Sequence, residues 1–561
     1  MADNPRIVII GGVAAGPKTA ARARRLMPNA EITIVEKDGY ISYAGCGMPF
    51  YLAGQVRDFN QLFMTAYGVA RDEGFFAREK GVTVLTRHEA VAVDREKKQV
   101  LVKDLTSGEE KQLPYDKLVL ATGSNPVVPP LKGLDLKGVY QLYNPADAQR
   151  IKEQLDDVGE AVIVGAGLIG LEVADALRSK NAFATIVELQ DQILPGLLDA
   201  DLAAILKARL EEQGLEIRLG EKVLEITGED GRVTGVKTDR EEISGDMVLI
   251  AVGVRPNVSL AREAGLEIGQ TGAIAVNEFL QTSDPDIYAV GDCVENRHLI
   301  SGQKVYLPMA TYANRQGRVA GDNLAGLGSK FAGVLGTAVL HVMGWNVART
   351  GLSEKQARAA GFEVETFLIA SHDRTHYHPG HGLVLLKVIG DAKTRRLLGV
   401  QGIGPGDVVK RIDVAATAMH FGATVDQLAE VDLAYAPPFN TPIDPLHHTA
   451  NAWRNKLQEL VPTVSAAQVK EKLDRGDDFV LLDVRTPQQY AAKHIEDDRV
   501  LLVTLGDMRQ RLADIPRDKE IVTLCAMGSR AYEALRILKG AGFENVKLME
   551  GGLQAWPYEI D

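Results

Sequence analysis

The sequence contains few cysteines and no long apolar run. Only three cysteines occur, Cys46, Cys293 and Cys525, and no two of them have the C-x-x-C spacing of a metal site. This usage excludes a disulfide scaffold and is typical of a cytoplasmic protein that uses its thiols one at a time. No apolar stretch approaches the ~20 residues that a membrane-spanning helix needs. We therefore expect no metal, no membrane partner and a cytoplasmic location.

An excess of basic residues is also lacking. The net charge is −12, which argues against nucleic acid or an anionic membrane as the main partner. No charged leader with a cleavage site precedes the first strand, which we expect to begin near Arg6. A chain of 561 residues with 45% hydrophobic content predicts a globular protein. Its length corresponds to about three or four domains.

Two glycine turns, each between a buried strand and a helix, are typical of dinucleotide binding. In the first turn the glycines let the backbone approach a pyrophosphate, and an acid after the next strand holds a ribose hydroxyl. Val13 stands where the middle glycine of the motif belongs, so this match is incomplete. The residues predicted to bind the cofactor here are Gly11, Gly12, Ala15, Gly16, Glu36 and Lys37.

The second turn is a complete G-x-G-x-x-G. It consists of Gly165, Gly167 and Gly170 at the required spacing, and the following strand ends at Glu188. Two such turns imply two dinucleotides. An acid at Glu188 favours a free ribose 2′-hydroxyl and therefore NADH, although the nearby Arg178 and Lys180 leave NADPH open.

Two further strand–turn motifs show a family resemblance. LVLATGSNP (118–126) resembles the short motif shared by flavoprotein disulfide reductases, and DIYAVGD (286–292) resembles their second FAD motif. The order of an FAD half, an NAD domain and a return to FAD is also that family's order, over residues 1 to about 450. The resemblance implies that Asp292 holds the ribityl chain of FAD. It adds these predicted cofactor-binding residues: Ala121, Thr122, Gly123, Gly253, Gly291 and Asp292.

The last hundred residues resemble a rhodanese domain. The resemblance rests on LLDVR (481–485), HI (494–495), CAMGSR (525–530) and GGLQAW (551–556), in that order. Backbone N–H groups of a six-residue loop that opens a helix can cradle an anionic sulfur. Cys525 is therefore predicted to carry sulfane sulfur as a persulfide, with Arg530 on the far side of the loop.

These motifs define the expected fold class. It is α/β, with two nested Rossmann-like dinucleotide-binding domains for FAD and NAD, an α+β dimerisation domain and a C-terminal α/β rhodanese domain. The predicted boundaries are residues 1–150 and 271–325 for the FAD domain, 151–270 for the NAD(P)H domain, 326–456 for the dimerisation domain, 457–464 for a linker and 465–561 for the rhodanese domain.

Cys46 is the predicted reductase thiol. It lies between two glycines ahead of a helix, where backbone N–H groups and the helix dipole are expected to lower its pKa. Dithiol flavoproteins have a second cysteine five positions later, but here that position holds Tyr51. The oxidised form must therefore be a mixed disulfide, a persulfide or a sulfenic acid. This leaves three reactions: reduction of coenzyme A disulfide, of persulfides, or of peroxide and oxygen.

The surroundings of Cys46 resemble coenzyme A disulfide reductases and the related persulfide reductases. Tyr435 matches the family segment that brings a tyrosine to the cysteine of the partner subunit, and Tyr377 matches the second such tyrosine. Either phenol could donate a proton to a leaving thiolate. The first glycine turn lacks the histidine of the peroxidase branch. Gly45 replaces the family's usual asparagine, which affects substrate detail rather than the reaction class.

The resemblance also implies a homodimer that binds coenzyme A as a substrate or ligand. Arg22 and Arg25 are predicted to bind the phosphates of coenzyme A, and Ser42 is a further substrate-binding candidate. We expect an FAD-dependent, NAD(P)H-consuming reductase of persulfide or polysulfide that releases hydrogen sulfide. The alternative is a coenzyme A disulfide reductase. An NADH peroxidase, an NADH oxidase and a redox sensor are the remaining hypotheses.

Overall fold

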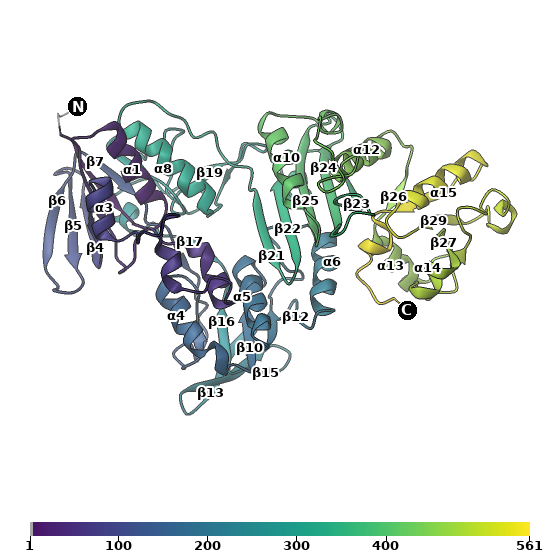
Figure 1. Ribbon diagram of the computed structural model, residues 1–561, viewed down its shortest axis with the longest axis horizontal. Coiled ribbons are helices and arrows are strands. Elements are labelled where there is room, and N and C mark those ends of the chain that lie inside the picture. The colour runs from purple at the N-terminus through teal and green to yellow at the C-terminus, as the bar shows by residue number, and fades with distance from the viewer. Residues whose placement is uncertain (1–3, 561) are drawn as a thin grey trace. The chain divides into compact units, whose positions relative to one another are not determined.

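The computed structural model describes residues 4–560, which form two compact units. The first unit contains the chain up to Leu189 together with Glu221–Val334. The second contains Gln190–Gly220 and the chain from Leu335 onward. The chain therefore passes from the first unit to the second twice. The first of these passages is a segment of 31 residues, 190–220. Each unit has its own α/β layers (Figure 1).

The first sheet of the first unit is parallel, with strand order β18-β7-β1-β2-β3. The last four residues of β1 are buried, as a strand covered on both faces requires. Ile10 lies beside Val35 of β2 and Leu120 of β7, so the carboxyl ends of these strands meet at one edge. The strand bounds are β1 (Arg6–Ile10), β2 (Glu31–Val35), β3 (Thr83–Leu85), β7 (Lys117–Leu120) and β18 (Ile287–Ala289).

Helices α1 (Ala15–Leu26) and α8 (Ala310–Leu324) lie side by side in this half (Figure 1). Two glycines of α8 allow the close approach. A Cβ on Gly317 would lie 2.6 Å from the carbonyl oxygen of Ala15, and one on Gly321 would lie 2.7 Å from the Cβ of Arg22. Helix α8 thus fixes the end of α1 where the first glycine turn enters it. The remaining elements of this half are η1 (Gly45–Gly47), α2 (Met48–Leu52), η2 (Phe59–Phe63), α3 (Glu73–Lys80), β4 (His88–Asp94), β5 (Gln99–Asp104), β6 (Glu110–Pro114), β19 (Asn296–Arg297) and β20 (Lys304–Val305).

A second parallel sheet in the first unit contains the strands β11-β10-β16-β9 in that order. Val164 of β10 lies beside Val187 of β11 and Ile250 of β16, which repeats the arrangement of the first sheet. Helix α5 follows β10 as α1 follows β1. The elements are β8 (Ser124–Pro126), β9 (Val139–Tyr140), α4 (Pro145–Gln154), η3 (Leu155–Asp157), β10 (Glu160–Val164), α5 (Leu168–Ser179), β11 (Phe183–Val187), β13 (Val223–Glu229), β14 (Arg232–Thr238), β15 (Glu242–Ser244), β16 (Met247–Ile250), β17 (Val254–Pro256) and α7 (Ser259–Glu263).

The second unit begins with an antiparallel sheet in the order β21-β22-β25-β24-β23. Every residue of β25 is buried, and helices α10 and α12 pack against the sheet. The elements are α6 (Ala200–Glu211), β12 (Glu216–Arg218), β21 (Ala338–Val342), β22 (Trp345–Gly351), α9 (Glu354–Ala359), β23 (Val364–His372), β24 (Leu383–Asp391), β25 (Leu397–Gly404), α10 (Val409–His420), α11 (Val425–Leu428) and α12 (Pro445–Leu457).

A buried lysine links the segment 190–220 to this sheet through ion pairs. The side chain of Lys387, on β24, is 4% exposed, and its nitrogen lies 2.8 Å from Asp201, 3.1 Å from Glu354 and 3.3 Å from Asp199. Burial alone would lower the pKa of Lys387, yet the surrounding carboxylates raise it above its ordinary value. The buried ammonium therefore offsets three carboxylates, one of them buried, that would otherwise repel one another.

We expect Lys387→Met to lower the free energy of unfolding by about 3–5 kcal/mol, because the carboxylates would lose their shared cation. Urea unfolding of the FAD-loaded protein at neutral pH measures this loss. Lys207→Met is the matched control, since Lys207 forms a more exposed pair with Glu211 on α6 in the same unit. The control should cost less than about 1 kcal/mol. Equal losses in the two variants would contradict a special role for Lys387.

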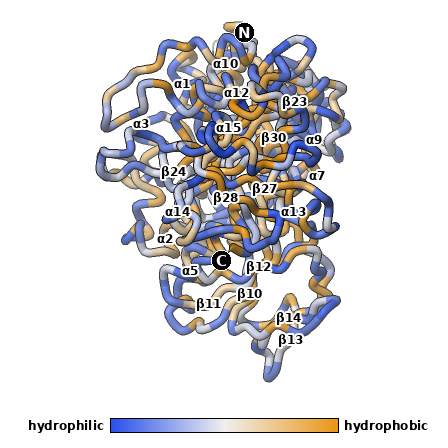
Figure 2. Tube along the Cα trace, turned by 90° about the vertical axis from the view of Figure 1, so that its right-hand side faces the viewer, coloured by the Kyte–Doolittle hydropathy of each residue, from blue (hydrophilic) through white to orange (hydrophobic). Residues whose placement is uncertain are grey.

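The final sheet is parallel, in the order β26-β30-β29-β27-β28. Strands β27 and β30 are drawn largely in the hydrophobic colour (Figure 2), in keeping with the complete burial of β27. Helices α13 and α15 have buried apolar faces that complete this small domain. The elements are β26 (Thr463–Val464), α13 (Ala466–Arg475), β27 (Phe479–Asp483), α14 (Pro487–Ala492), β28 (Val500–Leu502), η4 (Leu512–Asp514), β29 (Glu520–Leu524), α15 (Ser529–Gly540), β30 (Val546–Met549) and η5 (Gly552–Ala555).

A buried carboxylate fastens this small domain to the antiparallel sheet. Glu550 is 8% exposed and accepts hydrogen bonds from the backbone N–H of Leu368 and the ammonium of Lys456, each at 2.9 Å. The segment predicted as a linker, residues 457–464, ends in the edge strand β26. The two domains are thus joined by side-chain contacts as well as by the chain.

Candidate functional site

The first glycine turn forms a cradle at the N-terminal end of α1. Gly11 has a φ of +109°, and a Cβ there would lie 2.1 Å from the carbonyl oxygen of Ala121. A Cβ on Gly16 would lie 1.9 Å from the Gly11 carbonyl oxygen. The buried carboxylate of Glu36 accepts the N–H of Gly12 at 2.5 Å. Only glycine fits these positions, and such a turn at a helix start suits a dinucleotide pyrophosphate.

The second glycine turn repeats this geometry. Gly165 has a φ of +108°, and a Cβ on Gly170 would lie 2.1 Å from the Gly165 carbonyl oxygen. Gly167 caps α5, and a Cβ there would meet nothing within 4 Å, so the N-terminal end of this helix is open. The carboxylate of Glu188 accepts the N–H of Ala166 at 2.8 Å. This turn suits a second dinucleotide.

Asp292 lies just after β18, at the carboxyl edge of the first sheet. Burial raises its pKa to about 6. A buried carboxylate gains from a hydroxyl partner, as the ribityl chain of FAD would provide. The preceding Gly291 donates its N–H to Gln316 at 2.7 Å. Of the other residues predicted to bind cofactor, Ala15 begins α1, Gly253 follows β16 of the second sheet, and the rest follow β2 or β7 of the first sheet directly or nearly so, with Lys37 after β2 and Ala121, Thr122 and Gly123 after β7.

Cys46 lies in the single turn η1, directly before α2. Its side chain is exposed, yet surrounding protein atoms desolvate the sulfur enough to raise the pKa of the thiol. The carboxylates of Glu172 and Asp292 raise this pKa further, so these three groups share one site. The lowered pKa expected from the sequence is therefore wrong for the chain by itself. The reason is that α2 has five residues, and its dipole does not offset burial and two carboxylates.

The predicted substrate-binding residues also lie in the first unit. Ser42 has a φ of +51° and donates its N–H to the carbonyl oxygen of Gly12 at 2.8 Å. Arg22 donates to Asp322 at 2.5 Å, and Arg25 is exposed. Part of the Arg22 guanidinium is thus already engaged within the protein. Binding of coenzyme A phosphates by Arg22 and Arg25 stays a prediction.

The two predicted tyrosines lie on two loops of the second unit. Residues 373–382 form the Tyr377 loop, and residues 434–444 form the Tyr435 loop, which precedes α12. The side chains are 65% exposed for Tyr377 and 47% exposed for Tyr435. Hydrogen bonding with the Tyr377 hydroxyl raises the pKa of Tyr435. The fold therefore brings together two phenols that are 58 positions apart in the sequence.

Cys525 is buried at the end of β29, where the chain turns into α15. It is 1% exposed, and the backbone N–H of Gly528 donates to its sulfur at 3.1 Å. Gly528 has a φ of +104°, which turns this N–H inward. Arg530 donates to the side chain of Gln489 at 2.8 Å. A sulfur held by a backbone N–H at the start of a helix is suited to carry negative charge.

Known families match the chain along most of its length. Residues 5–317 match the family described as pyridine nucleotide-disulphide oxidoreductase. The dimerisation domain of that family matches residues 337–445, and a rhodanese-like domain matches residues 465–558. The chain belongs to the pyridine nucleotide-disulphide oxidoreductase family. The predicted family and fold class are confirmed.

Individual members of the family are similar to this oxidoreductase. The NAD(P)H coenzyme A polysulfide/persulfide reductase of Pyrococcus horikoshii is 38% identical over 79% of this chain and 96% of that protein. The coenzyme A disulfide reductase of Staphylococcus aureus is 30% identical over 78% of this chain and 98% of that protein. A solved structure of an NAD-dependent persulfide reductase from A. fulgidus is 41% identical, with a TM-score of 0.94, covering 98% of this chain and all (100%) of that chain.

Oxidoreductases of this family depend on FAD and NAD(P)H, and the two glycine turns fit these cofactors. The first turn and Asp292 would hold FAD, and the opening at Gly167 with Glu188 would hold the nicotinamide nucleotide. FAD, when bound, supplies two-electron transfer between a nicotinamide and a sulfur. Across residues 4–560, no group of three or more histidine, cysteine or acidic side chains could hold a metal ion. Within the same residues, every helix is too short or too polar to cross a membrane.

Glu172 is a site residue of this oxidoreductase that the sequence analysis missed. It lies on α5, two residues after the last glycine of the second turn, and burial raises its pKa to about 7. Its charge also raises the pKa of Cys46. The available signal was an acidic residue between two apolar ones, Leu171 and Val173, in the first turns of a cofactor-binding helix. Such a residue faces the site rather than open solvent.

We expect Glu172→Gln to lower the pKa of Cys46, because the substitution removes a nearby negative charge. Alkylation of Cys46 by iodoacetamide at pH 8 should become about two- to fivefold faster. The difference from the parent should shrink below pH 7, since Glu172, with a pKa of about 7, is then protonated in the parent as well. Mass spectrometry of the Cys46 peptide measures the rate. Glu153→Gln, at an exposed position of α4, is the control and should leave the rate unchanged.

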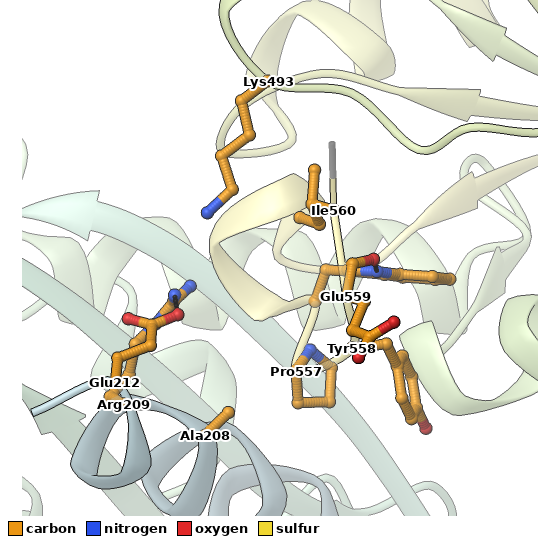
Figure 3. Close-up of a pocket in the computed structure, with 9 residues that line it drawn as sticks. Ala208, Arg209, Glu212, Lys493, Pro557, Tyr558, Glu559 and Ile560 are labelled. Carbon is orange, nitrogen blue, oxygen red and sulfur yellow. Dashed lines mark hydrogen bonds and ion pairs between the residues drawn. The ribbon is translucent and has the colours of Figure 1, made fainter. Parts of the chain in front are cut away.

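The second unit contains a cavity (Figure 3). Its volume is about 350 Å³, and it opens between α6 and the C-terminal residues 556–560, with Lys493 above them. Arg209 of α6 and Glu212, which directly follows this helix, line the cavity and pair with each other at 2.6 Å. None of the predicted site residues lines this cavity.

Proposed function

We propose that the chain is a homodimeric, FAD-dependent reductase that uses NAD(P)H to convert coenzyme A persulfide or polysulfide into thiol and hydrogen sulfide. One observation carries this proposal: a lone redox cysteine, Cys46, shares a chain with a sulfur-holding loop at Cys525. A domain that carries sulfane sulfur has a use in persulfide reduction. It has no evident task in the reduction of a symmetric disulfide. The printed names of the Pyrococcus horikoshii and A. fulgidus proteins support the same substrate class.

The proposed reaction balances as NAD(P)H + H⁺ + CoA–S–SH → NAD(P)⁺ + CoA–SH + H₂S. The Cys46 thiolate attacks the outer sulfur of the persulfide. The S–S bond of the substrate breaks, a new S–S bond to Cys46 forms, and the coenzyme A thiolate leaves. Two electrons that originate on NAD(P)H, with one proton, then convert the Cys46 persulfide back to the thiolate and release hydrogen sulfide.

The chain's other residues take supporting roles in this proposal. Tyr377 and Tyr435 donate a hydrogen bond or a proton to the leaving thiolate of the substrate. Arg22 and Arg25 bind the phosphates of coenzyme A, and Ser42 contacts the substrate. Glu172 and Asp292 can each take up or release a proton beside Cys46 near neutral pH, because burial raises the pKa of Glu172 to about 7 and that of Asp292 to about 6.

A homodimer is proposed from the matched dimerisation domain and from large apolar side chains that are exposed in the second unit, two of them in the Tyr435 loop. Phe421, Phe439 and Ile443 are exposed by 81%, 69% and 50%. A second copy of the chain would cover such a surface. Three cysteines without a disulfide suit a reducing compartment, so we place the enzyme in the cytoplasm.

Anaerobic NADH oxidation by the FAD-loaded protein tests the function. Coenzyme A persulfide, polysulfide and coenzyme A disulfide are compared at equal concentration, and sulfide is quantified. We expect one sulfide per NADH with persulfide and slower turnover with the disulfide. Faster turnover with the disulfide and no sulfide would overturn the proposal.

Coenzyme A disulfide reduction is the second candidate function. The 30% identity to the Staphylococcus aureus coenzyme A disulfide reductase favours it. This reaction also needs one cysteine, since CoA–S–S–CoA + NADH + H⁺ gives two CoA–SH and NAD⁺ through a mixed disulfide on Cys46. Oxygen consumption in air separates both candidates from an NADH oxidase, which would oxidise NADH rapidly without any sulfur substrate.

A further inference from the structure

A single buried arginine contacts the bases of both tyrosine loops. Arg411 lies in the first turn of α10 and is 1% exposed. Its guanidinium donates to the carbonyl oxygen of Asp373 in the Tyr377 loop at 2.6 Å. The same nitrogen donates to the side-chain oxygen of Asn440 in the Tyr435 loop at 3.0 Å. Asp373 and Asn440 are themselves 1% exposed, so water does not compete for these bonds.

The remaining donors of Arg411 are also used. Asp444, at the end of the Tyr435 loop, is 1% exposed and accepts a hydrogen bond from the Nε of Arg411 at 3.1 Å. Asp444 also caps α12 by accepting the N–H of Leu446 at 2.7 Å. A fourth contact is made by Nη1 of Arg411, which donates to the carbonyl oxygen of Asp407 at 2.7 Å. One planar, permanently charged group therefore joins the start of α10, the start of α12 and both loops, which the compact ammonium of lysine could not do.

Each loop is closed at its base and touches the other. In the Tyr377 loop, Asp373 and Gly382 exchange backbone and side-chain hydrogen bonds at 2.9 and 2.8 Å. In the Tyr435 loop, Asn440 donates to the carbonyl oxygen of Ala434 at 3.3 Å. Thr375 of the first loop donates to a carbonyl oxygen of the second, that of Pro437, at 3.3 Å. The positions of the exposed loop tips, which carry the two phenols, therefore depend on the hydrogen bonds at the loop bases.

We propose that Arg411 is a positioning residue for sulfur reduction: it holds the Tyr377 loop and the Tyr435 loop so that their phenols act as one proton-donating pair. This inference rests on the proposed function of the two tyrosines. Arg411 reaches no exposed surface and acts only through the loops. Proton transfer to a leaving thiolate requires a donor within hydrogen-bond reach, and a misplacement of about 1 Å can cost about 100-fold in rate.

Arg411→Lys keeps the charge and removes the planar fork, so it tests the proposal with the least risk to folding. Stopped-flow absorbance of the FAD-loaded enzyme separates the two half-reactions. We expect flavin reduction by NADH to keep the parent rate. Reoxidation by coenzyme A persulfide should slow by about 10- to 100-fold, with little change in the KM for NADH. An equal loss in both half-reactions, or no loss, would overturn the proposal.

A coupling measurement separates positioning from a general loss of structure. In an enzyme that already carries Tyr377→Phe and Tyr435→Phe, Arg411→Lys should slow reoxidation by less than about twofold, because the pair it positions is gone. If Arg411→Lys slows reoxidation in this double variant by the same factor as in the parent, the inference is refuted. Arg395→Lys is the matched control: Arg395 pairs with Asp426 in the same domain, away from both loops, and this variant should keep the parent rate.

Hydrogen exchange provides a readout that does not depend on the proposed reaction. Arg411→Lys should raise exchange in the peptides of the Tyr377 and Tyr435 loops and leave the peptides of β24 and β25 unchanged. If the parent turns over no persulfide but both loops still loosen, the proposed function fails while the positioning role stands. If the loops do not loosen, the positioning role fails. Should Arg411→Lys not fold, Asn440→Ala tests the same contact to the Tyr435 loop alone and should slow reoxidation in the same way.

Discussion

Replacing Cys46 by serine is expected to lower NADH-dependent sulfide release from coenzyme A persulfide by at least about 10³-fold. The hydroxyl of serine is nearly isosteric with the thiol, but it is un-ionised near neutral pH and cannot form the S–S bond that carries the sulfur. Tyr51 occupies the position of a second thiol, so no neighbouring cysteine can take over. Loss of flavin absorbance on anaerobic addition of NADH should persist, because neither glycine turn is altered.

The control for Cys46→Ser is Cys293→Ser. Cys293 is buried, and its sulfur donates to the carbonyl oxygen of Val290 at 3.2 Å, a contact that a hydroxyl can also make. This variant should keep sulfide release within about twofold of the parent. Retention of normal sulfide release by Cys46→Ser would remove Cys46 from the mechanism and would leave the first unit without a redox thiol.

The strand–turn–helix units that the sequence predicts are found in the fold, and they are built from local patterns. Each glycine turn and its acid lie within one strand–helix–strand unit, so spacing alone identifies Gly11 with Glu36 and Gly165 with Glu188. The CAMGSR loop is equally local, because a buried strand, a cysteine and a helix start follow one another directly. Backbone geometry decides these sites, and the backbone follows from nearby residues.

The parts that could not be predicted depend on residues brought together from distant positions. Arg411 and Asp373 are 38 positions apart, and Lys387 and Asp201 are 186 apart. No periodicity connects such residues, because their contact is decided by how distant segments of one unit pack together. The prediction of a lowered pKa for Cys46 was wrong for the same reason. The local pattern shows glycines and a helix, but the carboxylates that raise this pKa, Glu172 among them, come from other elements.

Cys525→Ala is expected to abolish sulfur transfer by the C-terminal domain while leaving the reductase centre intact. With thiosulfate as donor and coenzyme A as acceptor, the transfer is S₂O₃²⁻ + CoA–S⁻ → SO₃²⁻ + CoA–S–S⁻. The Cys525 thiolate takes the outer sulfur of thiosulfate, releases sulfite and passes that sulfur to coenzyme A. Alanine has no sulfur to do this, so sulfite release should fall by at least about 10³-fold. Reduction of preformed coenzyme A persulfide should stay within about twofold of the parent.

Measuring both variants in both assays separates the two centres. Cys46→Ser should still release sulfite from thiosulfate but produce no sulfide, and Cys525→Ala should show the reverse pattern with preformed persulfide. Ser529→Ala, at an exposed position of the same loop, is the matched control and should keep both activities. If Cys525→Ala also loses the reduction of preformed persulfide, sulfur must pass through Cys525 on its way to Cys46. The two centres would then form one obligatory path rather than two reactions joined by free coenzyme A persulfide.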